Sequence, residues 1–118
     1  MKKVSLLILL NLFSSFVIAA SFDCTKATTF VEKTICSEPL LSKLDDALAE
    51  NYIGMYYSNF GGSQKSLKAE QQKWLSSRNR CTNSKCLITS YQKRIDETCD
   101  YGVISGLHPI CKMSDEIK

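Results

Sequence analysis

Six cysteines restrict the folds open to this chain more than any other feature of its sequence. An even number of cysteines in a short exported domain is typical of a disulfide framework, and six can pair in fifteen ways. The spacing favours three local bridges, Cys24–Cys36, Cys81–Cys86 and Cys99–Cys111. Each would close a short loop and stabilise the fold by about 2–3 kcal/mol. A zinc site is the weaker alternative, because Cys81 and Cys86 lack a second closely spaced cysteine pair and the only histidine, His108, is remote.

Residues 1–20 have the features of a signal peptide. Two lysines form a positively charged start, an apolar run follows, and Ala20 precedes Ser21 at a small-residue cleavage site. An uncleaved anchor helix is the alternative, because the apolar span reaches Ala20. Cleavage after Ala20 would leave residues 21–118 as a single domain without a transmembrane segment. We therefore expect a periplasmic or secreted protein.

Apolar residues at helical spacing predict four helices, and no β-alternation is visible. The predicted helices cover about residues 30–36, 39–57, 64–80 and the stretch from the Cys81–Cys86 turn to residue 98. Thr29 and Glu32 form the pattern of a capping box, and Ser37 is the predicted N-cap of the second helix. The second helix carries the apolar stripe Leu41, Leu44, Leu48, Tyr52 and Met55, with Asp45, Asp46 and Glu50 largely off it.

The regular pattern ends after residue 97, where glycines and a proline interrupt it. We expect residues 98–118 to form an irregular tail that the Cys99–Cys111 bridge pins to the bundle, with residues 113–118 frayed. The predicted fold class is therefore all-α, a small disulfide-stapled bundle of about four helices with an irregular C-terminal tail.

Trp74, the only tryptophan, is the predicted centre of the core. On a helix, Trp74, Leu75 and Arg78 share one face, so the Arg78 guanidinium can stack on the indole and still reach a carboxylate. Asp45 is the predicted partner, because a buried arginine needs a neutralising group. A ligand-binding platform at Trp74 is the alternative to a core role.

The charges are arranged in blocks along the chain. Residues 61–95 carry eight basic side chains and one acidic, whereas the segments on either side are acidic overall. The acidic neighbours can neutralise this basic block in the fold. Alternatively, the block forms a patch for a polyanion such as an anionic cell-wall surface. The sequence contains no nucleic-acid-binding motif, and we do not expect nucleic acid as a partner.

Motifs of catalysis are not found in the sequence. His108 lies beside Pro109 in the tail, and no hydrolase triad, nucleophile elbow, phosphate-binding loop or zinc helix motif can be assembled. Asp45 and Asp46 are adjacent, so on a helix they would point about 100° apart, which suits a carboxylate pair poorly. Cysteines in disulfides are not nucleophiles. We therefore predict a protein that is not an enzyme and holds neither a cofactor nor a metal.

Several short motifs together resemble the LprI-type domain. They are Phe22-Asp23-Cys24, the run TFVEKTIC from Thr29 to Cys36, Leu44-Asp45 with Leu48 and Tyr52, Gln72-Lys73-Trp74-Leu75 with Arg78-Asn79 and Cys81, and Cys86-Leu87 with Tyr91 and Arg94-Ile95. The resemblance covers about residues 22–97. It implies an exported bacterial all-α protein whose first four cysteines form two family disulfides. The structural core motif that it implies comprises Leu44, Asp45, Leu48, Tyr52, Trp74, Leu75, Arg78, Asn79, Tyr91 and Ile95.

The named member of that family inhibits lysozyme, the muramidase that cuts peptidoglycan. This chain departs from the family pattern by adding Cys99 and Cys111 and by lacking the named member's lipid anchor. The resemblance nevertheless suggests an exported inhibitor that occludes the cleft of a lysozyme-like muramidase. The alternative is a periplasmic or envelope binding protein whose partner is another protein or the cell wall.

The glycine-rich loop between the second and third predicted helices is the expected partner contact. Phe60 can act as an apolar anchor or fold back onto the core, and Ser63 or Lys65 can approach catalytic carboxylates.

Overall fold

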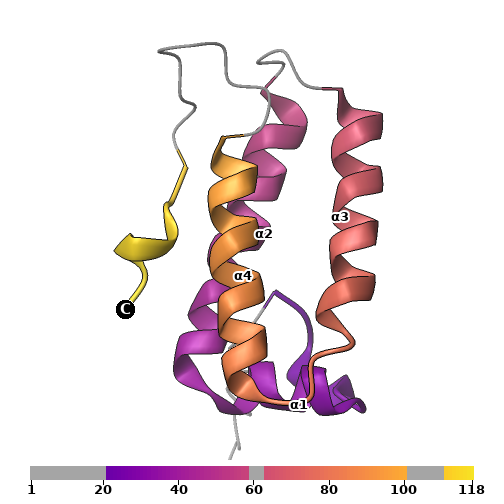
Figure 1. The fold of residues 1–118 in the computed structure, drawn as a ribbon, viewed down its shortest axis with the longest axis vertical. Coiled ribbons are helices and arrows are strands. Elements are labelled where there is room, and N and C mark those ends of the chain that lie inside the picture. Colours follow the sequence, from indigo (N-terminus) through magenta and orange to yellow (C-terminus); the bar gives the residue numbers. More distant parts are fainter. Residues whose placement is uncertain (1–20, 59–62, 101–110) are drawn as a thin grey trace, which may run out of the picture.

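The computed structural model describes residues 21–58, 63–100 and 111–118. Over these residues the chain forms four α-helices and no strand, which confirms the all-α prediction (Figure 1). The helices are α1 (Phe30–Ser37), α2 (Pro39–Tyr57), α3 (Gln64–Arg78) and α4 (Ser84–Cys99), with short 3-10 helices η1 (Cys24–Lys26) and η2 (Ser114–Glu116). The predicted signal peptide, Phe60 and His108 lie outside the described residues.

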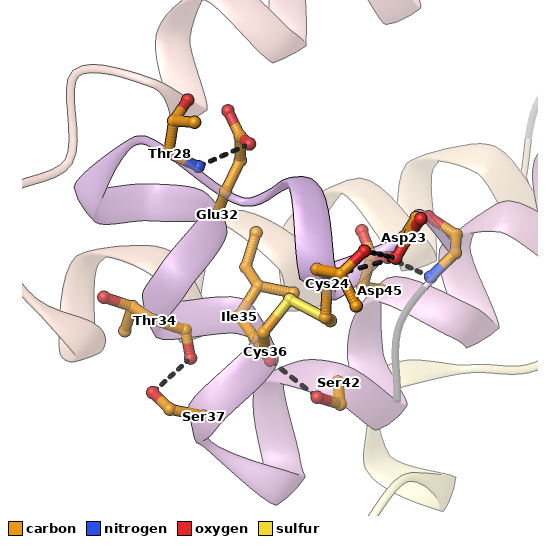
Figure 2. Close-up of a disulfide and its surroundings, with 12 residues drawn as sticks. Asp23, Cys24, Thr28, Glu32, Thr34, Ile35, Cys36, Ser37, Ser42 and Asp45 are labelled. Atoms are coloured by element: carbon orange, nitrogen blue, oxygen red, sulfur yellow. Dashed lines mark hydrogen bonds between the residues drawn. A yellow bond between two sulfur atoms is a disulfide. The ribbon is translucent and has the colours of Figure 1, made fainter. Parts of the chain in front are cut away.

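Side-chain caps fix where three of the helices begin. Thr29 Oγ1 accepts a hydrogen bond from the Glu32 backbone N–H at 3.1 Å. The Glu32 carboxylate accepts from the backbone N–H of Thr28 at 3.3 Å, one residue earlier than in a regular capping box (Figure 2). Ser63 and Asn83 likewise accept from the backbone N–H three residues on, at the starts of α3 and α4. Each such cap stabilises its helix by about 1 kcal/mol.

The predicted cap at Ser37 is wrong, because α1 runs through Ser37 and the N-cap of α2 is Glu38. The Ser37 hydroxyl donates back to the Thr34 carbonyl oxygen at 3.3 Å (Figure 2). Pro39 starts α2 without needing a backbone N–H partner. The Glu38 carboxylate instead accepts a hydrogen bond from the Ser84 hydroxyl, which ties the α1–α2 corner to the start of α4.

The core lies mainly between α2 and α4, which pack side by side (Figure 1). In this core cluster the fully buried apolar side chains are Ile35, Leu41, Leu44, Leu87, Tyr91 and Ile95. Tyr91 is therefore the large aromatic side chain at the centre, and the prediction that Trp74 holds this place is wrong. Trp74 is only half-buried and packs against the cluster from α3. The reason is that α3 lies less closely against α2 and α4 than those two helices lie against each other.

Three disulfides stabilise the ends of the bundle: Cys24–Cys36, Cys81–Cys86 and Cys99–Cys111. The first joins η1 to α1 beside the buried Ile35, as Figure 2 shows. The second closes the turn between α3 and α4, and the third ties the end of α4 to the C-terminal segment.

The C-terminal segment is held in place, so the prediction that residues 113–118 are frayed is wrong. The buried Asn51 side chain accepts from the Lys112 N–H at 2.9 Å and donates to the Lys112 carbonyl oxygen at 2.8 Å. The backbone N–H and the hydroxyl of Ser114 both donate to the Asp96 carboxylate at 2.8 Å. These bonds fix η2 on the side of α4 that faces away from α3 (Figure 1).

Candidate functional site

Three polar side chains from three helices meet at the edge of the core. Asp45 in α2 is only 5% exposed. Its Oδ1 accepts a hydrogen bond from the Tyr91 hydroxyl at 2.7 Å, and that hydroxyl accepts one from Arg78 Nη1 at 2.8 Å. The charges of Asp45 and Arg78 are thus connected through the Tyr91 oxygen, where the sequence predicted a direct pair. We refer to this chain of hydrogen bonds as the Asp45–Tyr91–Arg78 relay.

Aromatic contacts hold the relay in position. The Trp74 ring meets the Tyr91 ring edge-on with 5.1 Å between centroids, and Trp74 Nε1 donates to the Ser90 carbonyl oxygen at 3.3 Å. The Arg78 guanidinium carbon lies 5.5 Å from the Trp74 centroid, so the predicted cation–π contact is present. Asn79 Oδ1 accepts from Arg78 Nε and Nη2 at 3.2 and 2.9 Å. The guanidinium is therefore fixed on several sides.

The electrostatics of the relay keep the Tyr91 hydroxyl protonated. Burial raises the pKa of Tyr91 far above its usual value, and the charge of Asp45 raises it further, whereas Arg78 lowers it. Partial burial raises the pKa of Asp46, and the charges of Asp45 and Glu50 add to this effect. A general acid or base works best with a pKa near the working pH. Tyr91 does not meet that condition and remains a protonated donor to Asp45.

An open groove of about 570 Å³ lies beside the relay, between α2 and α3. Its walls are mostly apolar. Its lining comprises Ser21, Phe22, Asp45, Leu48, Ala49, Tyr52, Ile53, Lys68, Gln71, Gln72, Trp74, Leu75 and Arg78. We call it the α2–α3 groove. Trp74 therefore packs against the core through Tyr91 and also lines the groove.

The groove continues into a surface that we call the tyrosine–lysine surface, formed by Tyr52, Ile53, Tyr56, Tyr57 and Lys68 around a hollow of about 330 Å³. Tyr57 is 72% exposed and Ile53 is 58% exposed. The Tyr56 ring stacks on Tyr52 at 6.0 Å and meets Tyr57 edge-on at 5.1 Å. The aromatic rings thus support one another on one side of α2, facing Lys68 of α3.

Ser63 and Lys65, two of the predicted partner contacts, lie at the start of α3 and are exposed. Gln64 Nε2 donates to the Tyr56 carbonyl oxygen at 2.7 Å and holds the start of α3 against the end of α2. Lys65 therefore lies at the same end of the molecule as the tyrosine–lysine surface, one helical turn before Lys68.

The basic block divides into a neutralised part and an exposed part. Arg94 is only 4% exposed, and its Nε donates to Gln71 Oε1 at 2.9 Å. Its Nη1 lies 3.5 Å from the Glu97 carboxylate and 3.9 Å from that of Glu70, while the buried Nη2 has no hydrogen-bond partner among the described residues. Within residues 61–95, the exposed basic side chains that form no ion pair with another described residue are Lys65, Lys68, Lys73, Arg80 and Lys85.

Sequence reasoning missed Ile53 and Tyr57 as surface features. The signal was present, because Ala49, Ile53 and Tyr57 recur every four residues on α2, outside the stripe that faces α4. A second row of apolar residues on a helix whose first row already fills the core is expected to meet another element or remain exposed.

Metal binding and membrane spanning are two other roles to consider for residues 21–58, 63–100 and 111–118. No three histidine, cysteine or acidic side chains there are placed to hold a metal ion. None of the helices in this part of the chain has both the length and the apolar character needed to cross a membrane. Comparison of the chain with protein-family models, with curated proteins and with solved structures finds no match. Its function must therefore be inferred from its own residues.

Proposed function

We propose that the protein is an exported, non-enzymatic inhibitor of a lysozyme-like muramidase and that it blocks the enzyme's cleft. The resemblance of residues 22–97 to the LprI-type domain supports this class of partner. The three disulfides support export, because such bonds form and persist in the periplasm or outside the cell.

The observation that carries the proposal is the exposed tyrosine–lysine surface with Lys65 beside it. Lysozyme-like muramidases cleave glycan with two carboxyl groups in a cleft. Lys65 and Lys68 lie in the first turns of α3, where the helix dipole adds positive potential. Cationic groups attract an acidic cleft and speed association, while the exposed Ile53 and Tyr57 supply apolar contact area that slows dissociation.

The surface is also preorganised for binding. It is presented by two helices rather than by a loose segment, and the hydrogen bond from Gln64 to the Tyr56 carbonyl oxygen fixes their ends together. The stacked rings of Tyr52 and Tyr56 restrict one another's rotamers. Side chains that are already ordered lose little conformational freedom on binding, which favours affinity.

A turbidity assay tests the proposal. Lysozyme is mixed with a peptidoglycan suspension with and without the oxidised protein, and the decay of turbidity is followed. We expect slower lysis as the protein is added. Unchanged lysis at a large molar excess, tested with several muramidases of this type, would refute the proposal.

Two variants and a matched control locate the contact. Lys65→Glu should weaken inhibition by reversing a charge that faces the cleft, and Tyr57→Ala should weaken it by removing an apolar anchor. Lys73→Glu is the control, because Lys73 is an exposed lysine of the same helix that lines neither the groove nor the tyrosine–lysine surface. Equal inhibition by all three variants would place the contact elsewhere.

The second candidate function is binding to an anionic cell-wall surface, and the five exposed basic side chains favour it. Binding that depends on such charges falls steeply with salt, because counterions screen them. Pull-down of the protein with purified cell walls at rising salt concentration separates the two functions. A cell-wall interaction lost at moderate salt supports this candidate, whereas inhibition that survives the same salt supports the muramidase.

A further inference from the structure

The backbone nitrogen of Ser21 lies against a buried carboxylate. The Ser21 N–H donates to Asp45 Oδ2 at 2.8 Å, and the Ser21 hydroxyl donates to the same oxygen at 2.5 Å. Asp45 is 5% exposed, whereas Ser21 is exposed. The contact therefore joins the first described residue of the chain to the Asp45–Tyr91–Arg78 relay.

We propose that cleavage after Ala20 turns this contact into an ion pair between the new α-ammonium group of Ser21 and the Asp45 carboxylate, so that processing stabilises the fold. Hydrolysis breaks the Ala20–Ser21 peptide bond. The hydroxyl of water adds to the Ala20 carbonyl carbon, and the Ser21 nitrogen leaves as an amine that takes up a proton at neutral pH. A signal peptidase is the class of enzyme that performs this step. The inference rests on the proposed export of the chain.

The position of the nitrogen is set by the rest of the N-terminal segment. Phe22 packs against the core, and Cys24 is tied to Cys36. Because consecutive Cα atoms are about 3.8 Å apart, one additional residue would carry the charge away from Asp45. A start at Ser21 is therefore the one that brings the ammonium group to the carboxylate.

The charges around Asp45 are compatible with the α-ammonium group of Ser21 as a partner of Oδ2. From α4 the neutral Tyr91 hydroxyl faces Oδ1, and from α3 the Arg78 guanidinium acts on it through that hydroxyl. Asp46 adds negative charge from the same helix. Among the described residues, Ser21 alone donates to Oδ2, and both of its donors are neutral in the uncleaved chain. A positive charge at this place compensates a buried anion far better than an amide dipole does.

Acetylation of the α-amine provides a matched control, because it removes the positive charge and leaves an amide N–H donor like that of the uncleaved chain. The full chain is expressed with residues 1–20, the exported protein is purified, and mass spectrometry establishes its first residue. Half of the sample is then acetylated selectively at the α-amine. We expect the free-amine form to unfold at a temperature about 4–8 °C higher than the acetylated form. Asp45→Asn should abolish this difference, because the partner charge is gone.

The pH dependence supplies a second readout that needs no variant. A free α-amine has a pKa of about 8, and an ion pair raises it in the folded state. The advantage of the free-amine form is therefore complete below about pH 8 and disappears as the pH rises further. Equal unfolding temperatures of the two forms near neutral pH would overturn the ion pair, and a first residue other than Ser21 would overturn the cleavage site. Neither measurement involves a muramidase, so their outcome is independent of the inhibition assay.

Discussion

Replacing Tyr91 by phenylalanine isolates the contribution of the relay to stability. The substitution removes one oxygen atom from a fully buried side chain and leaves the ring that packs against Trp74. Asp45 Oδ1 loses its donor, while Oδ2 keeps its contact with Ser21. Arg78 is only half-buried, so water can replace its lost bond. A buried hydrogen bond to a charged group contributes about 1.5–3 kcal/mol, so we expect Tyr91→Phe to lower the free energy of unfolding by about 2–3 kcal/mol.

Urea unfolding measures this loss. The midpoint should fall while the slope of unfolding free energy against urea stays constant, because the substitution does not change the surface exposed on unfolding. Heating should show a midpoint about 10–20 °C lower. Tyr57→Phe is the matched control, since it removes the same atom from a side chain that is 72% exposed. A loss below about 0.5 kcal/mol for Tyr91→Phe, the size of an ordinary surface substitution, would refute the relay as a stabilising element.

The raised pKa of Tyr91 determines how the stability of the fold changes at alkaline pH. The pKa of Tyr91 is raised in the fold, so above about pH 10 the unfolded chain loses this proton while the folded chain retains it. Stability from the protonated hydroxyl is therefore complete below about pH 10 and falls at higher pH. Unfolding followed by circular dichroism between pH 9 and pH 12 should show this fall, and Tyr91→Phe should reduce its steepness. An identical pH profile in the variant would contradict the assignment.

The remaining predictions concern three other polar contacts. Asn51→Ala removes both hydrogen bonds to Lys112, so it should lower the free energy of unfolding by about 2 kcal/mol and speed proteolysis of the C-terminal segment, as measured by urea unfolding and limited digestion. Arg94→Met should destabilise by less than about 1 kcal/mol or stabilise, because its carboxylate neighbours stay about half exposed to water; a loss of 3–5 kcal/mol in urea would contradict this. Asn83→Ala removes the cap of α4 and should cost about 1 kcal/mol, measured in the same way.

The helices could be predicted well because their signals are local. Pro39 and an apolar stripe define α2, and its predicted and observed bounds agree at 39 and 57. The shared face of Trp74, Leu75 and Arg78 on α3 was also predicted, and all three side chains are half-buried. The end of α3 was placed two residues late, at residue 80 instead of 78, because no residue there signals a stop as strongly as a proline would.

The relay could be predicted only in part. The motif suggested that Arg78 would stack on Trp74 and need a carboxylate, and Asp45 was the residue chosen. The sequence did not predict that Tyr91 connects Arg78 to Asp45. Tyr91 lies 46 residues from Asp45 in the chain, and local sequence patterns do not indicate contacts between residues so far apart. The periodicity also placed Asp45 off the buried stripe, whereas in the structure it is buried and hydrogen-bonded to Tyr91 and Ser21.

The C-terminal segment was mispredicted because its order comes from tertiary contacts. Short polar sequences without helical periodicity ordinarily fray at chain ends. Here the side chain of Asn51 forms hydrogen bonds with the backbone of Lys112, and the carboxylate of Asp96 accepts one from the backbone N–H of Ser114. Both anchoring residues belong to other helices, so the sequence of the segment itself carries no sign of them.

The order of the disulfides along the chain has a consequence for biogenesis. Each bridge joins two cysteines with no other cysteine between them in the sequence, at separations of 12, 5 and 12 residues, so no bridge encloses or crosses another. A chain that emerges N-terminus first from an export channel exposes each pair before the following one. A general thiol oxidant acting on the nascent polypeptide can then set the right connectivity at once, without an isomerase to correct errors.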